Sequence, residues 1–174
     1  MSMNPARDLL VTGLRNAHGM ETQARELMAR QCDRLGDYPA VQTKLRQHLE
    51  ETVQQLHRLE QCLAACGETS SAIKDTLMSA LANLTAFGHA AADDEVLKNT
   101  FANEAFEHYE IAAYRSLITL CEQAGMSGLQ EPLRQSLAEE QRMAAWLDDH
   151  VEEITLSYLA KRSAGARSGL SELT

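Results

Sequence analysis

The chain has 174 residues, which suits one domain that buries roughly 70% of the surface exposed by its unfolded form. Its formal net charge of −9 at pH 7 disfavours nucleic acid and anionic membranes as partners. No apolar run approaches the roughly 20 residues of a membrane span, and the N-terminus lacks the apolar segment of a signal peptide. We therefore expect a cytoplasmic protein.

Composition favours helices along the whole chain. The sequence holds only three prolines and nine glycines, and 5% of its residues are aromatic. Residues that favour helices, such as Ala, Leu, Glu, Gln and Arg, abound, whereas the residues that favour strands are few. The sequence therefore predicts an all-α fold.

Prolines and glycines divide the chain into five predicted helices. Each proline stands at the start of a helical pattern, where its missing N–H costs nothing, and glycines mark the ends. Asn4 is a candidate cap for the first helix. The predicted helices cover residues 5–35, 39–66, 70–88, 94–124 and 130–160. We expect a bundle over 1–160 and a flexible C-terminal tail over 161–174, because this last segment is rich in Ser, Gly and Ala.

The third predicted helix, about 28 Å long at 1.5 Å per residue, can carry the chain back along a bundle. Short turns near Gly36 and Gly125 then make two antiparallel hairpins, one on each side of this crossover. Hairpin, long crossover and hairpin is the topology of ferritin-like bundles. The sequence therefore predicts a ferritin-like four-helix bundle with an additional short helix in the crossover.

The four cysteines lack the spacing of a zinc knuckle. Cys62 and Cys66 lie four residues apart on one helix face, where each is predicted to be a small buried hydrophobe. We expect no redox or metal role for them.

The first and last long helices each carry a glutamate inside an otherwise apolar stripe. Steps of four and three residues mark the inner face of a helix, and Glu21 and Glu140 keep that step. The stripes are Leu10, Leu14, Ala17, Glu21, Ala24 and Met28, and Leu133, Leu137, Glu140, Ala144, Leu147, Val151 and Ile154.

The other two long helices carry acidic residues on or beside their inner faces. Glu51 and Gln55 flank Thr52, the polar member of the stripe Leu45, Leu49, Thr52, Leu56, Leu59 and Leu63. In the predicted helix over 94–124, either of two faces could be the one that turns toward the core. They are Asn103, Glu107, Glu110, Tyr114, Leu117 and Cys121, and the more apolar Leu97, Phe101, Ala105, His108 and Ala112.

In an antiparallel hairpin, residues equidistant from the turn lie at the same height. Glu21 and Glu51 are equidistant from Gly36, and Glu110 and Glu140 are equidistant from the glycine of the second turn. A buried carboxylate must be protonated, paired or coordinated, although a glutamate at the edge of a bundle could instead reach solvent. Several acidic groups at one level without matching Lys or Arg favour a metal site. Their oxygens suit Mg²⁺ and Mn²⁺ and, with a supporting histidine, iron or zinc.

Five segments between about residues 8 and 155 share their spacing with one known family. They are Asn16-Ala-His-Gly-Met-Glu21-Thr-Gln-Ala, Gln47-His-Leu-Glu-Glu51-Thr, Ser71-Ala-Ile-Lys-Asp75, Phe106-Glu107-His-Tyr-Glu110-Ile-Ala and Ala138-Glu-Glu140-Gln-Arg-Met-Ala-Ala-Trp-Leu147. On these segments the sequence resembles the YciE/YciF family of ferritin-like stress proteins, and specifically its YciE branch.

This resemblance implies a dimer of four-helix bundles, each with an extra short helix and a core carboxylate site for a pair of metal ions. Iron or manganese is expected there, with zinc as the alternative. The resemblance carries the ligand positions over to Glu21, Glu51, Glu107, Glu110 and Glu140. The biochemical activity of the family is not established.

One departure from di-iron bundles bears on every enzymatic proposal. Such bundles use Glu-x-x-His on two helices, and this chain has none. It carries His-x-x-Glu instead, at His18/Glu21 and His48/Glu51, where each histidine could ligate or orient a glutamate or simply lie at the surface. His108 is expected to pack rather than to ligate. The candidates for supporting groups or alternative ligands are His18, His48, Gln55 and His108.

These patterns support two functions. The first is a ferritin-like stress-response protein whose dinuclear carboxylate site acts on peroxide, oxygen or iron. The second is a non-catalytic helical stress or scaffold protein with a degenerate metal site, which the missing Glu-x-x-His favours. Apolar residues beside the inner stripes, such as Leu9 and Leu27, also predict self-association as a homodimer.

Overall fold

The computed structural model describes residues 4–68 and 95–171, and from residue 165 on it describes the backbone alone. The described residues form four long α-helices and one short 3₁₀ turn, with no strand among them, so the predicted all-α fold is confirmed. The short crossover helix predicted over 70–88 lies outside the described residues. The elements are α1 (Pro5–Cys32), α2 (Pro39–Ala65), α4 (Glu95–Gln123), η2 (Ser127–Leu129) and α5 (Gln130–Ser171).

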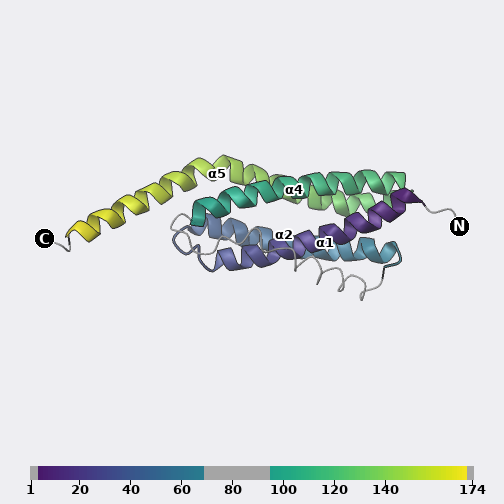
Figure 1. The fold of residues 1–174 in the computed structure, drawn as a ribbon, viewed down its shortest axis with the longest axis horizontal. Coiled ribbons are helices and arrows are strands. Elements are labelled where there is room, and N and C mark those ends of the chain that lie inside the picture. The colour runs from purple at the N-terminus through teal and green to yellow at the C-terminus, as the bar shows by residue number, and fades with distance from the viewer. Residues whose placement is uncertain (1–3, 69–94, 172–174) are drawn as a thin grey trace.

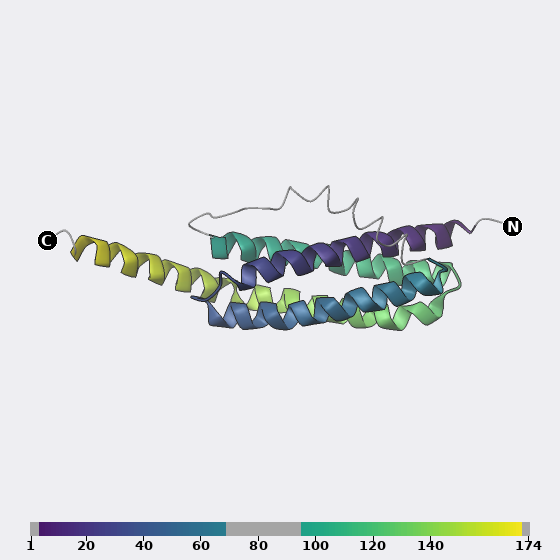
Figure 2. The same ribbon diagram turned by 90° about the horizontal axis from the view of Figure 1, so that it is seen from below.

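The four helices form an elongated bundle (Figures 1 and 2). Helices α1 and α5 run in one direction along it, and α2 and α4 run in the other. Each of α1 and α5 packs against both α2 and α4, so α1–α2 and α4–α5 are the two antiparallel hairpins that the sequence predicts. This arrangement is the ferritin-like four-helix bundle. Within the described ranges, no helix combines the length and apolarity needed to cross a membrane.

The helix ends agree with the signals in the sequence. The side-chain oxygen of Asn4 accepts a hydrogen bond of 3.1 Å from the N–H of Ala6, which confirms Asn4 as the cap of α1. Helices α2 and α4 end just before Gly67 and Gly125, whose φ angles of 87° and 71° fall in the left-handed region. Glycine adopts that region without steric cost, and these two residues terminate the helices at the ends of the bundle.

Helix α5 continues to Ser171 instead of ending near residue 160, and its last part leaves the bundle as a single helix (Figure 1). The described part of the predicted tail is therefore helical. The ammonium of Lys161 lies 5.2 Å from the centre of the Tyr38 ring, a cation–π contact that ties this part of α5 to the α1–α2 turn. The division into a bundle over 1–160 and a flexible tail over 161–174 stays a prediction.

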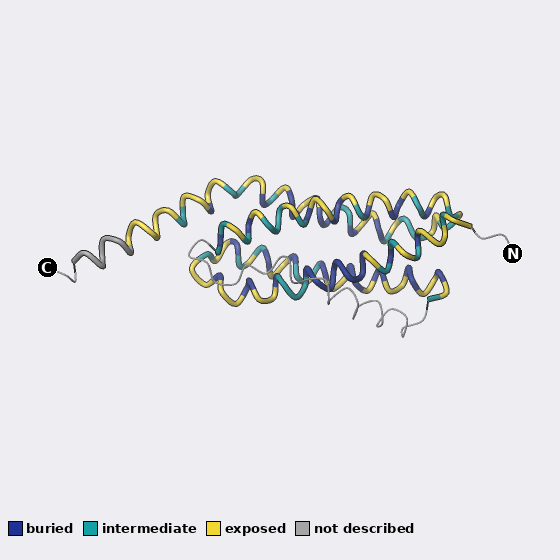
Figure 3. The backbone as a smooth tube through the Cα atoms, viewed as in Figure 1, coloured by how far each residue is buried: buried dark blue, intermediate teal, exposed yellow. Residues whose placement is uncertain are grey.

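The core consists of two apolar clusters separated by a polar layer. The first cluster includes Met20 of α1 and Leu59 of α2, and the second begins at Ala24 of α1 and includes Leu45 of α2. On both helices the residues between the clusters therefore form an intermediate layer, where α1 carries Glu21. Figure 3 shows the buried positions turned toward the interior of the bundle.

The buried faces match most of the predicted stripes. On α4 the face with Glu107 and Glu110 is buried, whereas Phe101 and His108 on the alternative face are exposed, which decides between the two faces left open by the sequence. All four cysteines are buried and free, as predicted for Cys62 and Cys66. The buried face of α4 therefore places its carboxylates in the polar layer.

Helices α1 and α4 approach closely at Gly13, where a Cβ atom would lie 2.8 Å from Cδ2 of the buried Leu117. We expect Gly13→Ala to lower the free energy of unfolding by about 1 kcal/mol. Overpacking of a core costs about 1–3 kcal/mol, and this exceeds the gain of about 1 kcal/mol from the helix propensity of alanine. Urea denaturation of the purified variant measures the change.

Gly36 is a matched control because a Cβ atom there would meet nothing within 4 Å. Gly36→Ala should therefore leave the urea midpoint unchanged or raise it slightly. Equal midpoints for the Gly13→Ala and Gly36→Ala variants would contradict the close approach of α1 and α4.

Candidate metal centre

All four helices send buried polar side chains into the layer between the two apolar clusters. The cluster that they form consists of Glu21 from α1, His48 from α2, Glu107 and Glu110 from α4, and Glu140 from α5. None of these residues is more than 3% exposed, because each lies on the inner face of its helix. Their burial removes the alternative that these glutamates reach solvent at the edge of the bundle. We call this set the carboxylate cluster.

His48 lies at the centre of the contacts that the cluster makes. Its Nε2 atom is 3.3 Å from Oε2 of Glu107 and 3.2 Å from Oε2 of Glu140. One ligand atom from each of these three residues lies within 4.8 Å of the other two, a spacing that could hold a metal ion. The other ring nitrogen, Nδ1, is 3.0 Å from Oε2 of Glu51, a contact that fixes the orientation of the ring.

A buried tyrosine fixes one oxygen of Glu21. The hydroxyl of Tyr114, which is fully buried, donates a hydrogen bond of 2.6 Å to Oε1 of Glu21. The other oxygen, Oε2, is buried and has no protein partner. Glu21 therefore has one oxygen available to a ligand in the cluster.

Five carboxylate oxygens in the cluster are buried without a hydrogen-bond partner. Glu140 contributes both of its oxygens, and Glu21, Glu107 and Glu110 contribute one each. A buried acceptor left unpaired costs about 1–3 kcal/mol, and more when it is charged. Protons or metal ions would remove this cost, and an oxygen-rich set with one imidazole nitrogen suits iron or manganese. The residues present therefore fit a metal centre.

The electrostatics of the cluster favour protons or cations. Burial, together with neighbouring carboxylates, raises the pKa of Glu21 and of Glu110 well above its usual range. Burial also raises the pKa of Glu140, to about 8. For His48, burial alone would lower the pKa, but the carboxylates of Glu107, Glu140 and Glu51 raise it to about 12. Four buried glutamates thus share the charge of a single imidazole, and the fully ionised cluster carries an excess of negative charge.

The predicted ligand Glu51 does not join the cluster. Its side chain is partly exposed, and its Oε1 atom lies 3.2 Å from Nη2 of Arg142. Hydrogen bonding to His48 lowers the pKa of Glu51 despite its partial burial. His48 occupies the inner position because the buried face of α2 runs through Leu45, His48, Thr52, Gln55 and Leu59. The step of three from Leu45 to His48 is the sequence signal for this face, whereas Leu49, in the predicted stripe, is only half-buried.

The remaining candidates take different positions. Nε2 of His18, which is buried, lies 3.4 Å from Oε1 of Glu60. His108 is exposed on α4, so the expectation that it packs in the core is wrong. Its place on the exposed side of α4 follows from the burial of its neighbour Glu107.

The structure also shows a buried ion pair, between Arg58 and Glu139, that the patterns in the sequence did not indicate. Gln55, a candidate supporting group, is fully buried and donates a hydrogen bond of 3.0 Å from its amide to Oε2 of Glu139. Arg58 lies one helical turn after Gln55, and this spacing on the inner face of α2 is the available sequence signal. Gln55 therefore contacts Glu139, the neighbour of Glu140, and has its own Oε1 atom unpaired.

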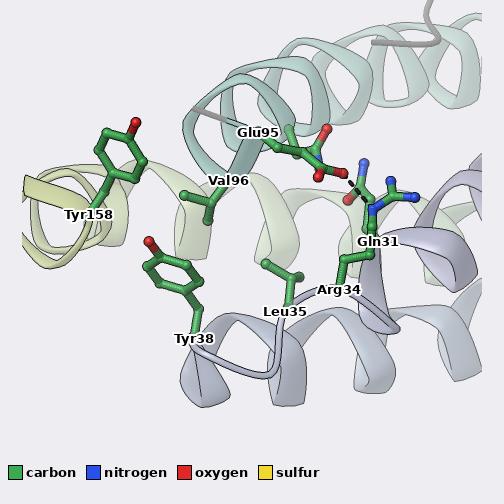
Figure 4. A pocket seen from close by; sticks show the side chains of 8 residues that line it. Gln31, Arg34, Leu35, Tyr38, Glu95, Val96 and Tyr158 are labelled. Atoms are coloured by element: carbon green, nitrogen blue, oxygen red, sulfur yellow. Dashed lines mark hydrogen bonds and ion pairs between the residues drawn. The ribbon is translucent and has the colours of Figure 1, made fainter. Parts of the chain in front are cut away.

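A separate pocket of about 190 Å³ lies at the end of the bundle from which α5 leaves. Its lining includes Gln31, Tyr38 and Tyr158, together with Arg34 and Glu95, which form an ion pair of 2.6 Å (Figure 4). The side chains that line it do not include any of the carboxylate cluster. Its two charged residues are already paired with each other, so the candidate centre is the cluster and not this pocket.

The sequence and the fold both resemble known proteins. Residues 5–160 match the family described as Domain of unknown function (DUF892). Protein YciF of Escherichia coli (strain K12) is 29% identical over 160 residues, which cover 86% of this chain and 92% of YciF. The structure of protein XCC3681 from Xanthomonas campestris pv. campestris superposes on this chain with a TM-score of 0.76 and 32% sequence identity. The match covers 91% of this chain and 98% of the XCC3681 chain. The structure of the E. coli stress protein YciF has a TM-score of 0.67 and 24% identity, covering 88% and 98%, which supports the fold alone.

We expect the free energy of unfolding of the metal-free protein to fall as the pH rises from about 5.5 to 8.5. The pKa of Glu140 rises from the ordinary 4.5 to about 8 on folding, so across this window the folded chain holds a proton that the unfolded chain has released. The raised pKa values of Glu21, Glu110 and His48 act in the same direction. The lowered pKa of Glu51 acts in the opposite direction, at more acidic pH.

Urea midpoints measured in chelator at several pH values within this window test the expectation. The Glu140→Gln variant is the control, because it cannot titrate at this position and should show a shallower dependence on pH. A midpoint of the parent protein that stays constant or rises with pH would contradict the raised pKa values.

Proposed function

This chain belongs to the DUF892 family, and we propose that it is a ferritin-like stress-response protein whose bundle core holds a pair of metal ions. The stress role draws on YciF, a relative that is described as a stress protein. Within the YciE/YciF group we assign the chain to the YciE branch, on the spacing of the segments around Glu21, Glu51 and Glu140.

The observation that carries the proposal is the set of five buried carboxylate oxygens in one layer of the core that have no hydrogen-bond partner. The four glutamates would together offset the charge of a pair of divalent ions, which removes the cost of burying them without partners. Among the described residues, the imidazole of His48 is the nitrogen donor that contacts these carboxylates.

We assign the ligands to the carboxylate cluster as the structure arranges it. Glu21, Glu107, Glu110 and Glu140 would supply oxygens, and His48 would supply Nε2 in the place that the resemblance gives to Glu51. Glu51 would then orient His48 by accepting a hydrogen bond from the N–H at Nδ1. Bound iron or manganese would supply the change of oxidation state needed to handle peroxide, oxygen or iron.

Elemental analysis of protein purified without chelator tests this function. We expect about two equivalents of iron or manganese per chain, as in dinuclear bundles. Stoichiometric zinc alone would contradict redox chemistry, because zinc does not change its oxidation state.

A specific observation also favours the non-catalytic alternative. Di-iron bundles carry a histidine three residues after the glutamate, and this chain has Met143 at that position after Glu140. Met143 is fully buried in the second apolar cluster and cannot replace the imidazole. Protein that takes up no iron, manganese or zinc in solution would support a scaffold with a degenerate site.

Glu140→Gln should keep the fold and lose most of the bound metal, because a neutral amide is a far poorer ligand than a carboxylate. Glu140→Leu should stabilise the metal-free protein, since it removes a carboxylate that is fully buried without a hydrogen-bond partner. Metal content and urea midpoints of both variants measure these effects. The exposed Glu152 on the same helix provides the control, and Glu152→Gln should match the parent in both measurements. Unchanged metal in Glu140→Gln would show that Glu140 is not a ligand.

We also propose that the protein self-associates as a homodimer through an apolar helix face. Large apolar side chains are exposed in pairs on two of the helices, Phe101 and Tyr109 on α4 and Leu156 and Leu159 on α5, and singly on the other two, Leu9 on α1 and Val53 on α2. Sedimentation velocity at micromolar concentration should show twice the chain mass of 19.3 kDa. Replacing either pair by serine should yield a monomer if that pair lies in the interface. A monomeric parent protein would contradict self-association.

A further inference from the structure

The carboxylate cluster is enclosed, so a metal ion must pass another group to reach it. The exposed fraction of the side chains falls steadily along one line of contacts. It is 58% for Arg142, 19% for Glu51 and 1% for His48. Tyr114, which contacts the cluster at Glu21, is fully buried and offers no such opening. Within the described parts of the chain, this line of contacts therefore leads from the cluster to a side chain that is exposed to solvent.

The contacts along this line are continuous. Nη2 of Arg142 lies 3.2 Å from Oε1 of Glu51, and the other oxygen of Glu51 lies 3.0 Å from Nδ1 of His48. Nε2 on the opposite side of the same ring faces Glu107 and Glu140 at 3.3 and 3.2 Å. The imidazole of His48 therefore stands between a partly exposed carboxylate and two buried carboxylates of the core.

The outermost contact opens easily. An ion pair that is exposed to solvent stabilises by about 0–1 kcal/mol, so the guanidinium of Arg142 leaves Glu51 at little cost. The carboxylate that it uncovers is accessible to a divalent cation, which carries twice the charge of the guanidinium. Arg142 and a metal ion would thus compete for the same carboxylate.

We propose that Glu51 and Nδ1 of His48 form an outer cation site through which divalent metal ions reach the carboxylate cluster, and that Arg142 closes this site. The inference rests on the proposed metal centre and assigns Glu51 to loading instead of resident ligation. An ion that binds to the ring displaces a proton from it to solvent, and the neutral imidazole that remains has one lone pair, so His48 serves either the outer position with Nδ1 or the buried position with Nε2. Occupancy of the outer site is therefore transient, and rotation of the ring hands the ion inward.

A loading residue changes rates, whereas a resident ligand changes the amount of metal bound. We test this with Co²⁺ added to the metal-free full-length chain, following cobalt absorption by stopped flow and at equilibrium. Glu51→Gln should slow loading by about tenfold, the lower end of the 10–10³-fold range by which charged clefts raise association rates, because the carboxylate that first attracts the ion is lost. Its cobalt content at saturation should equal that of the parent, since the amide oxygen of Gln still accepts a hydrogen bond from Nδ1 of His48.

Arg142→Met should have the opposite effect and speed loading several-fold, again with an unchanged cobalt content. The same route serves release, so extraction of Co²⁺ by a chelator should slow in Glu51→Gln and speed up in Arg142→Met by similar factors. Glu50→Gln and Arg134→Met are matched controls at exposed positions on α2 and α5, and both should load at the parental rate. Circular dichroism checks that each variant keeps its helices.

The outcomes separate this inference from the proposed function. A parent protein that binds no Co²⁺ overturns both. A parent that binds Co²⁺ while Glu51→Gln and Arg142→Met load at its rate overturns the loading route and leaves the metal centre standing. Loss of cobalt at saturation in Glu51→Gln, to the level of Glu140→Gln, would make Glu51 a resident ligand and would also overturn the loading route.

Discussion

The burial of four carboxylates around one imidazole is the constraint on which the rest of this structure depends. Glu21, Glu107, Glu110 and Glu140 occupy one layer with His48, closed on both sides by apolar clusters. Apolar surroundings strengthen the repulsion among charged groups and deprive each group of water. The layer is therefore stable only when protons or cations enter it. The helices above and below must then supply the stability of the fold, and the two apolar clusters do so.

Two neighbouring residues on α5 show that the chain can provide partners for a buried carboxylate. Glu139 is ion-paired with Arg58 and accepts a hydrogen bond from Gln55. Glu140, the next residue, is also buried, but it shares its 3.2 Å contact to Nε2 of His48 with Glu107, and neither of its oxygens has a hydrogen-bond partner. A buried pair that is complete can be neutral in energy, whereas a buried charge without a partner costs several kcal/mol. Such local inconsistency is typical of functional sites, where a ligand supplies what the chain omits.

The sequence predicts the fold well because its signals are local. Prolines and left-handed glycines define the ends of helices, and the step of four and three places Glu21 and Glu140 on inner faces. Height in a hairpin also depends simply on distance to the turn. The rotation of a helix about its own axis is not fixed by the distance to the turn. On α2 the middle of the buried face is polar, so the sequence leaves both His48 and Leu49 as candidates for the inner position. The pairing of Arg58 with Glu139 depends on contacts between helices, which one sequence does not reveal.

On α2 the histidine precedes the glutamate, and this reversed order determines which of the two side chains faces the cluster. Three residues along a helix turn the side chain by about 300°, so one member of such a pair can face the core while the other lies at its edge. Here the histidine faces inward and the glutamate lies toward Arg142 and solvent. The corresponding position after Glu140 is Met143, fully buried among apolar side chains. The cluster therefore gathers one nitrogen and many oxygens, and this donor set favours manganese or iron over zinc, which prefers nitrogen and sulfur.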